Sequence, residues 1–396
     1  MYNESAIKHF VLGNQKFEAK DFEGAINEYR EAIIAEPNYY EAFIARGLAK
    51  IELFRYGAAM SDFDDAVRLR PNEPEAYKKR GALNLELSEF KDSIPDLTQA
   101  IKLSPSDFEL YKFRAEAKFN LNKLESAISD YSKAIDLQPD DAEIFFDRGL
   151  AFQEAGQYEK ALDDYTHSIA LDPTSALTYK YRGVLYYMLD QFTLAIADFD
   201  KAIELRPNYQ EAYRFRGDVF KASEDFQAAL IDYNRAIELK PHDHEALFNR
   251  AYVLDVLGNI PAAIEDYNKV VIYNKDLAEA WYNRAALHFG LKNYAAALQD
   301  YDKAAALAPD ASTYFNRGLT KENLSDYSGA IEDYTRAIGL NPDDGDFYQR
   351  RGFSKEKNGD LKGAIADFKS ALKAMPENKR LIQRISNLEK QLNSDK

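Results

Sequence analysis

Ten arginines recur at a regular interval along the chain, and a row of guanidinium groups could either bind anions or pair with carboxylates. They are Arg46, Arg80, Arg114, Arg148, Arg182, Arg216, Arg250, Arg284, Arg317 and Arg351. One aspartate accompanies each arginine at the same interval: Asp62, Asp96, Asp130, Asp164, Asp198, Asp232, Asp266, Asp300, Asp333 and Asp367. Because a planar guanidinium suits bidentate pairing with a carboxylate, we predict a ladder of ion pairs within or between repeating units. Ligand binding by the arginines is the alternative, and the burial of the side chains decides between the two.

Other residue types that could carry out chemistry are scarce. The five histidines are His9, His167, His242, His244 and His288. They do not have the spacing of a zinc site, and the nearest approach to one, His242-Asp243-His244, falls in an expected turn. The chain has no cysteine, no glycine-rich phosphate loop and no nucleophile elbow. We therefore expect no enzymatic activity, no cofactor and no metal site.

Composition and charge limit the class of protein and its partners. Aliphatic and aromatic residues make up 46% of the 396 residues, too many for a disordered chain. No apolar stretch approaches the roughly 18 residues that suggest a membrane span, and the first residues show no export signal. The net charge of −15 should repel nucleic acid and favour neutral or basic partners. The absence of cysteine fits a cytoplasmic setting.

The prolines reveal an internal repeat of 34 residues. The series consists of Pro37, Pro71, Pro105, Pro139, Pro173, Pro207, Pro241, Pro309, Pro342 and Pro376, with Lys275 in the one remaining slot. Only the step from Pro309 to Pro342 is shorter, at 33 residues. We expect the deletion in a loop, where it costs little.

Each repeat has the pattern of two helices joined by a turn. The first helix begins after the proline and carries an aromatic residue followed by Arg-Gly, as in Tyr77 to Gly81. The second has apolar residues at three- and four-residue spacing, which builds one buried stripe. Small residues in this stripe set the distance between paired helices: Ala127, Ala161, Ala195, Ala229, Ala263, Ala297, Ala330 and Ala364. Aromatic residues in it fill the space between repeats: Tyr131, Tyr165, Phe199, Tyr233, Tyr267, Tyr301, Tyr334 and Phe368.

These columns resemble the tetratricopeptide repeat family, whose 34-residue pattern has small, aromatic and proline positions at the same offsets. The resemblance implies an all-α fold, an α-solenoid whose repeats stack into a right-handed superhelix. We expect one superhelix over residues 1–376 and a C-terminal capping helix and tail over 377–396. Eleven repeats should start near residues 6, 40, 74, 108, 142, 176, 210, 244, 278, 311 and 345. Arginine before the glycine departs from the family's frequent leucine, kept only at Leu12, and is similar to bacterial members.

In this family the first helices line a concave groove, so the resemblance implies that a partner binds there. The lining positions are one, two and five residues after the first-helix aromatic, because these point away from the buried stripe. Their chemistry changes along the chain. Repeats three and four offer Lys78, Lys79, Lys112 and Glu116, and repeats five and six offer Phe146, Leu150, Tyr181, Val184 and Tyr187.

The sharpest candidate for a binding site lies in repeats eight to ten. Asn249, Asn283 and Asn316 occupy one position in three successive repeats. They are flanked by Phe248, Tyr252, Tyr282, Phe289, Phe315 and Leu319. A row of amides could hold an extended peptide backbone while the aromatics bind its side chains, which is similar to the asparagine ladder of the nucleocytoplasmic N-acetylglucosamine transferases. The alternative is that the asparagines are only solvated and the aromatics pack within the groove.

Two segments depart from the regular pattern. Ser93, Pro95 and Leu97 break the columns of repeat three, and because Pro95 lacks an amide we expect a softer joint there. Pro261 is expected at the start of a second helix, where proline is tolerated. After Pro376 an apolar stripe suggests a capping helix: Leu381, Ile382, Ile385, Leu388 and Leu392.

The features together predict a non-enzymatic scaffold that binds a protein or an extended peptide. An architectural or self-associating subunit is one alternative, and a substrate-recruiting accessory of an enzyme supplied in trans is another. The pair of lysine and asparagine that captures chaperone tails in this family is incomplete in every repeat, so we expect no binding of such tails.

Overall fold

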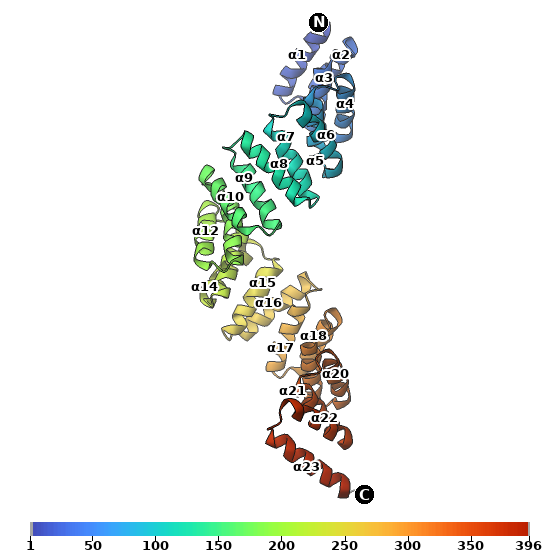
Figure 1. The fold of residues 1–396 in the computed structure, drawn as a ribbon, viewed down its shortest axis with the longest axis vertical. Helices are drawn as coiled ribbons and strands as arrows, with labels where there is room; N and C mark the ends of the chain where they lie inside the picture. Colours follow the sequence, from blue (N-terminus) through green and yellow to red (C-terminus); the bar gives the residue numbers. More distant parts are fainter. Residues whose placement is uncertain (1–2, 395–396) are drawn as a thin grey trace. The chain divides into compact units, whose positions relative to one another are not determined.

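The computed structural model describes residues 3–394, and these form 23 α-helices with no strand among them (Figure 1). The chain separates into two compact units, Met1–Pro207 (unit 1) and Asn208–Lys396 (unit 2). Unit 1 contains α1 (Glu4–Glu18), α2 (Phe22–Ala35), α3 (Tyr40–Ile51), α4 (Tyr56–Leu69), α5 (Pro74–Glu86), α6 (Phe90–Leu103), α7 (Phe108–Asn120), α8 (Leu124–Leu137), α9 (Ala142–Glu154), α10 (Tyr158–Leu171), α11 (Ala176–Met188) and α12 (Phe192–Leu205). Unit 2 contains α13 (Gln210–Ala222), α14 (Phe226–Leu239), α15 (His244–Val256), α16 (Ile260–Tyr273), α17 (Ala278–Gly290), α18 (Tyr294–Leu307), α19 (Ala311–Asn323), α20 (Tyr327–Leu340), α21 (Gly345–Lys357), α22 (Leu361–Ala374) and α23 (Lys379–Ser394).

Consecutive helices pair into hairpins within each unit. An odd-numbered helix is the first helix of a repeat and the next even-numbered helix is its second, so that α9 packs on α10 and α17 packs on α18. Each hairpin also packs on its neighbour in the same unit, as α8 does on α9 and α18 on α19. The prediction of an all-α fold built from stacked helical hairpins, an α-solenoid, is therefore confirmed.

The ends of the helices follow from local residue types. The side chain of Asp141 caps α9 by accepting a hydrogen bond from the backbone amide of Glu143 at 2.9 Å. The second helix α10 ends at Leu171, and the next residue, Asp172, has an extended backbone with φ −128° and ψ 90°. Pro173 follows, and a residue before proline is disfavoured in the helical region. The prolines thus favour these C-terminal ends, although α16 ends at the same position of its repeat with Lys275 in place of proline.

Small and aromatic residues hold the two helices of a repeat together. Ala161 and Tyr165 on α10 are fully buried. A Cβ atom on Gly149 of α9 would lie only 2.7 Å from Cε1 of Tyr165, so the ring occupies the space that a larger residue at 149 would need. The predicted roles of the alanine and aromatic columns in packing are confirmed, and the glycine serves the contact between paired helices.

Two irregularities in the sequence are absorbed locally. In the short repeat a three-residue loop, 308–310, joins α18 to α19. The corresponding loop between α16 and α17, residues 274–277, is one residue longer. The deletion therefore falls in a loop, as predicted. In repeat three α6 continues through Pro95, the buried Ser93 donates a hydrogen bond to the carbonyl of Gly81 at 2.8 Å, and Leu97 is fully buried. Pro261 lies in the first turn of α16, as predicted.

The main contacts between helices that are not immediate neighbours in the chain join first helices. In unit 1 α1 contacts α3, α5 contacts α7 and α7 contacts α9. In unit 2 α13 contacts α15, α17 contacts α19 and α19 contacts α21. The first helices are therefore closer together than the second helices, and they form the inner side of each stack. We call this side of each unit its first-helix face.

The last helix, α23, covers the end of the final repeat. Leu381, Ile385 and Leu388 are buried and pack with Phe368 of α22. The prediction was wrong for Ile382, whose side chain is 48% exposed. It lies one position past Leu381 on the helix and so faces away from α22. Residues 395 and 396 of the expected tail lie outside the described residues.

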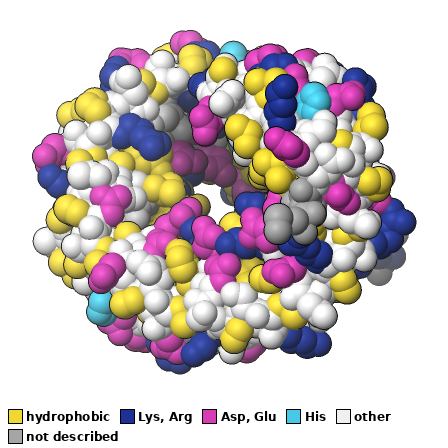
Figure 2. All heavy atoms as spheres, turned by 90° about the horizontal axis from the view of Figure 1, so that it is seen from above, with side chains coloured by type: hydrophobic (Ala, Val, Ile, Leu, Met, Phe, Trp, Pro, Cys, Tyr) yellow, Lys and Arg dark blue, Asp and Glu magenta, His cyan; other side chains and the backbone are white. Residues whose placement is uncertain are grey.

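The surface carries charges of both signs. Acidic and basic side chains are interspersed with apolar ones on the face shown in Figure 2. Within residues 3–394, no helix combines the length and the apolar character that crossing a membrane requires.

Candidate peptide-binding face

The arginine and aspartate columns form one ion pair in each of ten repeats. Arg148 is typical: its Nε donates to Oδ2 of Asp164 at 2.8 Å, and its Nη2 donates to Oδ1 at 2.8 Å. The same two-bond geometry occurs from Arg46 with Asp62 to Arg351 with Asp367. The predicted ladder is therefore confirmed, and each pair lies within one repeat.

In at least eight of these arginines the third nitrogen, Nη1, bonds to the second helix of the preceding repeat. Nη1 of Arg148 donates to Oγ of Ser132, on the second helix of the preceding repeat, at 3.0 Å. The Arg148 side chain is 19% exposed and that of Asp164 is 5% exposed. Because the polar edge of the guanidinium is occupied and largely buried, the ladder is structural and offers no anion-binding site. In the first repeat Glu28 instead accepts bonds from His9 at 2.8 Å and Lys16 at 2.7 Å.

On the first-helix face of unit 1, lysines bridge successive repeats. Lys78 lies 2.8 Å from Asp107 and also pairs with Glu109, and Lys112 pairs with Glu143. In each case the partner belongs to the start of the next first helix. These two lysines, expected to line a groove, are therefore neutralised by the protein itself.

A carboxyl group with an unusual environment lies beside Lys112. The pKa of Asp147 is raised to about 7, chiefly by burial; Lys112 acts to lower it, and the neighbouring carboxylates of Glu143 and Glu116 act to raise it. Burial also raises the pKa of Glu116. Asp147 occupies the position that asparagine holds in repeats eight to ten. This part of the face is rich in carboxyl groups with little counter-charge.

The aromatic residues of repeats five and six pack on one another. Tyr181 meets the ring of Phe146 edge-on at 5.4 Å between centroids, and the ammonium of Lys180 lies 3.6 Å from the centre of the Tyr181 ring. Tyr187 packs against Phe192 at 6.2 Å. The rings are half-buried, so part of each remains accessible.

The asparagines of unit 2 take part in hydrogen bonds within the protein. Asn249 donates to Oδ1 of Asp218 at 2.8 Å and accepts from Nζ of Lys221 at 2.8 Å. Asn283 donates to the hydroxyl of Tyr267 at 3.3 Å. Asn249 thus uses both the nitrogen and the oxygen of its amide, whereas Asn283 uses only the nitrogen. An amide can form further hydrogen bonds beyond these.

The last asparagine joins two repeats. Asn316 donates to the hydroxyl of Tyr282, in the preceding repeat, at 2.7 Å. Among the described residues, no hydrogen bond reaches the side-chain Oδ1 atoms of Asn283 and Asn316, whose amide nitrogens are the donors in these bonds. The row is therefore oriented by the protein, and these two carbonyl groups remain able to accept a bond.

The flanking aromatics rest on the second-helix tyrosines. Phe248 packs on Tyr267, Tyr282 on Tyr301 and Phe315 on Tyr334, with ring centroids 5.6 to 5.7 Å apart. Phe289 packs on Tyr294 at 5.4 Å and Leu319 is half-buried. The side chain of Tyr252 is 44% exposed. The predicted residues of repeats eight to ten thus lie on the first helices α15, α17 and α19.

A hollow of about 390 Å³ opens beside Tyr282, between α17 and α19. Its lining consists of Ala278, Glu279, Tyr282, Ala304, Ala308, Asp310, Ser312 and Thr313. The lining includes two small residues, Ala304 and Ala308, and two carboxylates, Glu279 and Asp310. The hollow is large enough to hold one side chain, and its lining is partly acidic.

Models of the tetratricopeptide repeat match residues 10–74, 142–175, 176–209, 216–276, 278–310 and 311–344, and a TPR repeat model matches 115–156. The chain belongs to the tetratricopeptide repeat family. This membership supports an interaction scaffold with protein or peptide partners, in a family whose repeats are typically not catalytic.

Several solved tetratricopeptide repeat structures are similar to this chain. MamA from Desulfovibrio magneticus RS-1 (residues 41 to the end) is 23% identical, with 44% of this chain and 99% of that one covered and a TM-score of 0.42. YrrB, described as a TPR protein with an unusual peptide-binding site, is 26% identical, with 46% and 94% covered and a TM-score of 0.41. A repeat protein from Parabacteroides merdae ATCC 43184 is 20% identical, with 63% and 99% covered and a TM-score of 0.47. No curated protein matches the chain.

The histidine cluster of this tetratricopeptide repeat protein has structural roles. Asp243 caps α15 by accepting from the amides of Glu245 at 3.0 Å and Ala246 at 3.1 Å. His242 packs edge-on against Tyr273 at 4.8 Å. Across residues 3–394, no group of three His, Cys, Asp or Glu side chains is placed to hold a metal ion.

Two residues on the first helix α13, Asp218 and Lys221, were not identified as candidates from the sequence. Asp218 accepts from Asn249 and from the hydroxyl of Tyr233 at 2.7 Å, and Lys221 completes this network. Burial raises the pKa of Asp218 and lowers that of Lys221. Asp218 stands five positions after Tyr213, so the positional rule for the groove could have found it.

Proposed function

We propose that this protein is a scaffold that binds an extended peptide segment of a partner on the first-helix face of unit 2. The site consists of Asn249, Asn283, Asn316, Phe248, Tyr252, Tyr282, Phe289, Phe315 and Leu319. The observation that carries the proposal is the hollow of about 390 Å³ lined by Tyr282, whose hydroxyl accepts a hydrogen bond from Asn316 of the asparagine row. A pocket for one side chain next to oriented amides is the arrangement by which an extended peptide is recognised.

The chemistry of the face defines the ligand. The carbonyl oxygens of Asn283 and Asn316 accept from backbone amides of the peptide, while the half-buried aromatics contact its apolar side chains. Glu279 and Asp310 in the lining of the hollow favour a neutral or basic side chain there. Tyr181 and Tyr187 give unit 1 a second aromatic surface of the same kind.

The test compares two sets of substitutions in the full-length protein. Asn283→Ala, Asn316→Ala and Tyr252→Ala together remove the acceptors and the most exposed ring, while Asn249 is kept because it holds Asp218 and Lys221. The matched control is Gln227→Ala, Gln299→Ala and Glu332→Ala, all exposed on second helices. Pulldown with quantitative mass spectrometry should lose specific partners only with the first set. Identical partners with both sets would refute the proposal.

Self-association is the competing use of this face, and light scattering separates the two. A monomer at micromolar concentration that still captures partners agrees with the proposal. A dimer that dissociates when Asn283, Asn316 and Tyr252 are replaced would assign the face to a second copy of the chain instead.

A further inference from the structure

The C-terminal part of the chain differs in charge from the rest. Residues 345–396 contain twelve lysines and arginines but seven aspartates and glutamates, whereas the whole chain has a net charge of −15. Basic residues are therefore concentrated in the last repeat and in α23. Such a local excess of one sign attracts partners of the opposite sign even when the net charge of the protein repels them.

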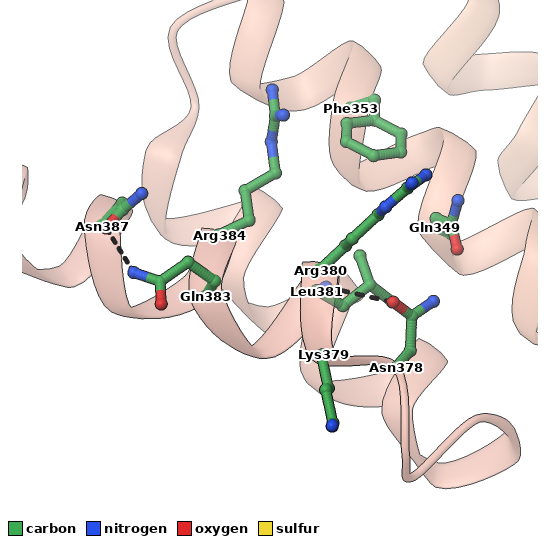
Figure 3. Close-up of a pocket in the computed structure, with 9 residues that line it drawn as sticks. All are labelled: Gln349, Phe353, Asn378, Lys379, Arg380, Leu381, Gln383, Arg384 and Asn387. Atoms are coloured by element: carbon green, nitrogen blue, oxygen red, sulfur yellow. Dashed lines mark hydrogen bonds between the residues drawn. The ribbon is translucent and has the colours of Figure 1, made fainter.

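A hollow of unit 2 lies within this basic segment. It has a volume of about 660 Å³ and lies between α21 and α23 (Figure 3). Its lining consists of Gln349, Phe353, Asn378, Lys379, Arg380, Leu381, Gln383, Arg384 and Asn387. Three of these side chains are cationic, four are amides and two are apolar, and no carboxylate is among them.

One cation of this hollow is fixed by the protein. Arg384 donates to Glu356 through Nε at 2.7 Å and through Nη2 at 2.9 Å, and its guanidinium lies 4.7 Å from the centre of the Phe353 ring. The pair holds Phe353 and Arg384 together as a rigid wall.

The other two cations of this hollow, Lys379 and Arg380, differ from Arg384 in that they are not fixed by an ion pair within residues 3–394. Lys379 and Arg380 are exposed, and among the described residues neither forms an ion pair or a hydrogen bond. In Figure 3 the Arg380 side chain extends toward Phe353 and Gln349 on α21. Arg380 therefore extends toward an apolar ring and an amide, while Lys379 also lines the hollow and points away from the ring (Figure 3).

A second hollow continues the basic surface. It has a volume of about 350 Å³ and shares Phe353 and Arg384 with the first. It adds Arg350, which is 46% exposed and lies 3.6 Å from Glu322, and the exposed Lys357. The two hollows together could contact several residues of an extended chain, with cations along its path.

We propose that the surface between α21 and α23 binds an acidic peptide segment of a partner protein, separate from the peptide on the asparagine row. Carboxylates of the segment pair with Lys379 and Arg380, and one apolar side chain rests on Phe353. The amides of Gln349 and Asn387 can bond to the peptide backbone. Electrostatic pairing with partly exposed cations gives a fast, salt-sensitive interaction.

The test uses fluorescence anisotropy with the full-length protein. The probe is a fluorescein-labelled ten-residue peptide of eight glutamates around two leucines, and its counterpart has lysine in place of glutamate. We expect the glutamate peptide to bind, with affinity falling at least tenfold between 50 and 300 mM NaCl, on the order expected for several charge contacts. Binding of the lysine peptide with equal affinity, or no binding of the glutamate peptide, would overturn the proposal.

Two charge-reversal variants test the location. Lys379→Glu with Arg380→Glu should weaken binding of the glutamate peptide at least about tenfold. Lys362→Glu with Lys390→Glu changes the net charge equally at exposed positions outside the hollow and should leave binding nearly unchanged. Equal losses in both variants would mean general charge attraction and would refute the site. A dimer of the unliganded protein that is lost only with Lys379→Glu and Arg380→Glu would identify a second copy as the occupant, against the proposal.

Discussion

Arg317 and Asp333 form the most buried ion pair of the ladder. The Nε atom of Arg317 lies 2.8 Å from Oδ2 of Asp333, and the aspartate side chain is fully buried while the arginine is 10% exposed. Lys321 approaches the same carboxylate at 2.8 Å, and Nη1 of Arg317 reaches Asp302 on α18 at 2.9 Å. One carboxylate thus connects α19 to α20, and the arginine connects both to the preceding repeat.

Replacement of Asp333 by alanine should destabilise the protein strongly. It leaves Arg317 and Lys321 buried without this counter-charge, which costs about 3–5 kcal/mol. Asp65→Ala is the control, because its partner Arg68 is 77% exposed and such a pair contributes about 0–1 kcal/mol. Urea unfolding followed by circular dichroism measures both. Similar shifts of the midpoint for the two variants would contradict the structural role of the ladder.

The ladder could be predicted because both partners recur with the repeat, as Arg148 and Asp164 do. The buried alanine and aromatic positions, such as Ala161 and Tyr165, could be predicted for the same reason, because they also recur with the repeat. The partners of Asn249 could not be predicted, because Asp218 and Lys221 are specific to one repeat and meet it only across the packed first helices.

The basic hollow at the C-terminal end could not be foreseen either. Phe353 and Arg384 come together because α23 crosses the last repeat, and the angle of that crossing is set by which apolar residues of α23 are buried. The apolar stripe predicted there wrongly included Ile382. The packing of α23 occurs once in the chain. A prediction of it therefore cannot be supported by a recurring pattern, as predictions for the repeats can.

Asp147→Asn should make the stability of the protein less dependent on pH. The pKa of Asp147 is raised to about 7 in the folded chain, chiefly by burial, and is about 3.9 in an unfolded chain. The stability that the protonated form contributes is present below about pH 4 and is lost as the pH rises to about 7.

Comparison at two pH values measures this effect. At pH 8 the free energy of unfolding of the variant should exceed that of the unmodified protein by on the order of 2 kcal/mol. Near pH 4.5 the two free energies should be similar. Asp163→Asn on α10 serves as the control, because Asp163 is an exposed aspartate. A constant difference between Asp147→Asn and the unmodified protein from pH 4.5 to 8 would show that Asp147 is not responsible.

Helix α6 should exchange its amide hydrogens faster than α8. Pro95 has no amide to donate to the carbonyl of Lys91, so one helical hydrogen bond is missing near the middle of α6. Hydrogen exchange followed by mass spectrometry compares peptides from 90–103 and 124–137. Pro95→Ala should bring the two rates together, and equal rates in the unmodified protein would contradict a softer joint.

Site-specific photo-crosslinking tests the central claim most directly. A photoreactive phenylalanine analogue replaces Tyr252, which is 44% exposed on the first-helix face, or Ile231, which is 68% exposed on the second helix α14. If a partner's peptide lies along the asparagine row, it should cross-link from position 252 and not from 231, and the link should disappear with Asn283→Ala and Asn316→Ala. Cross-links of equal yield from both positions, or from 231 alone, would contradict binding at this face.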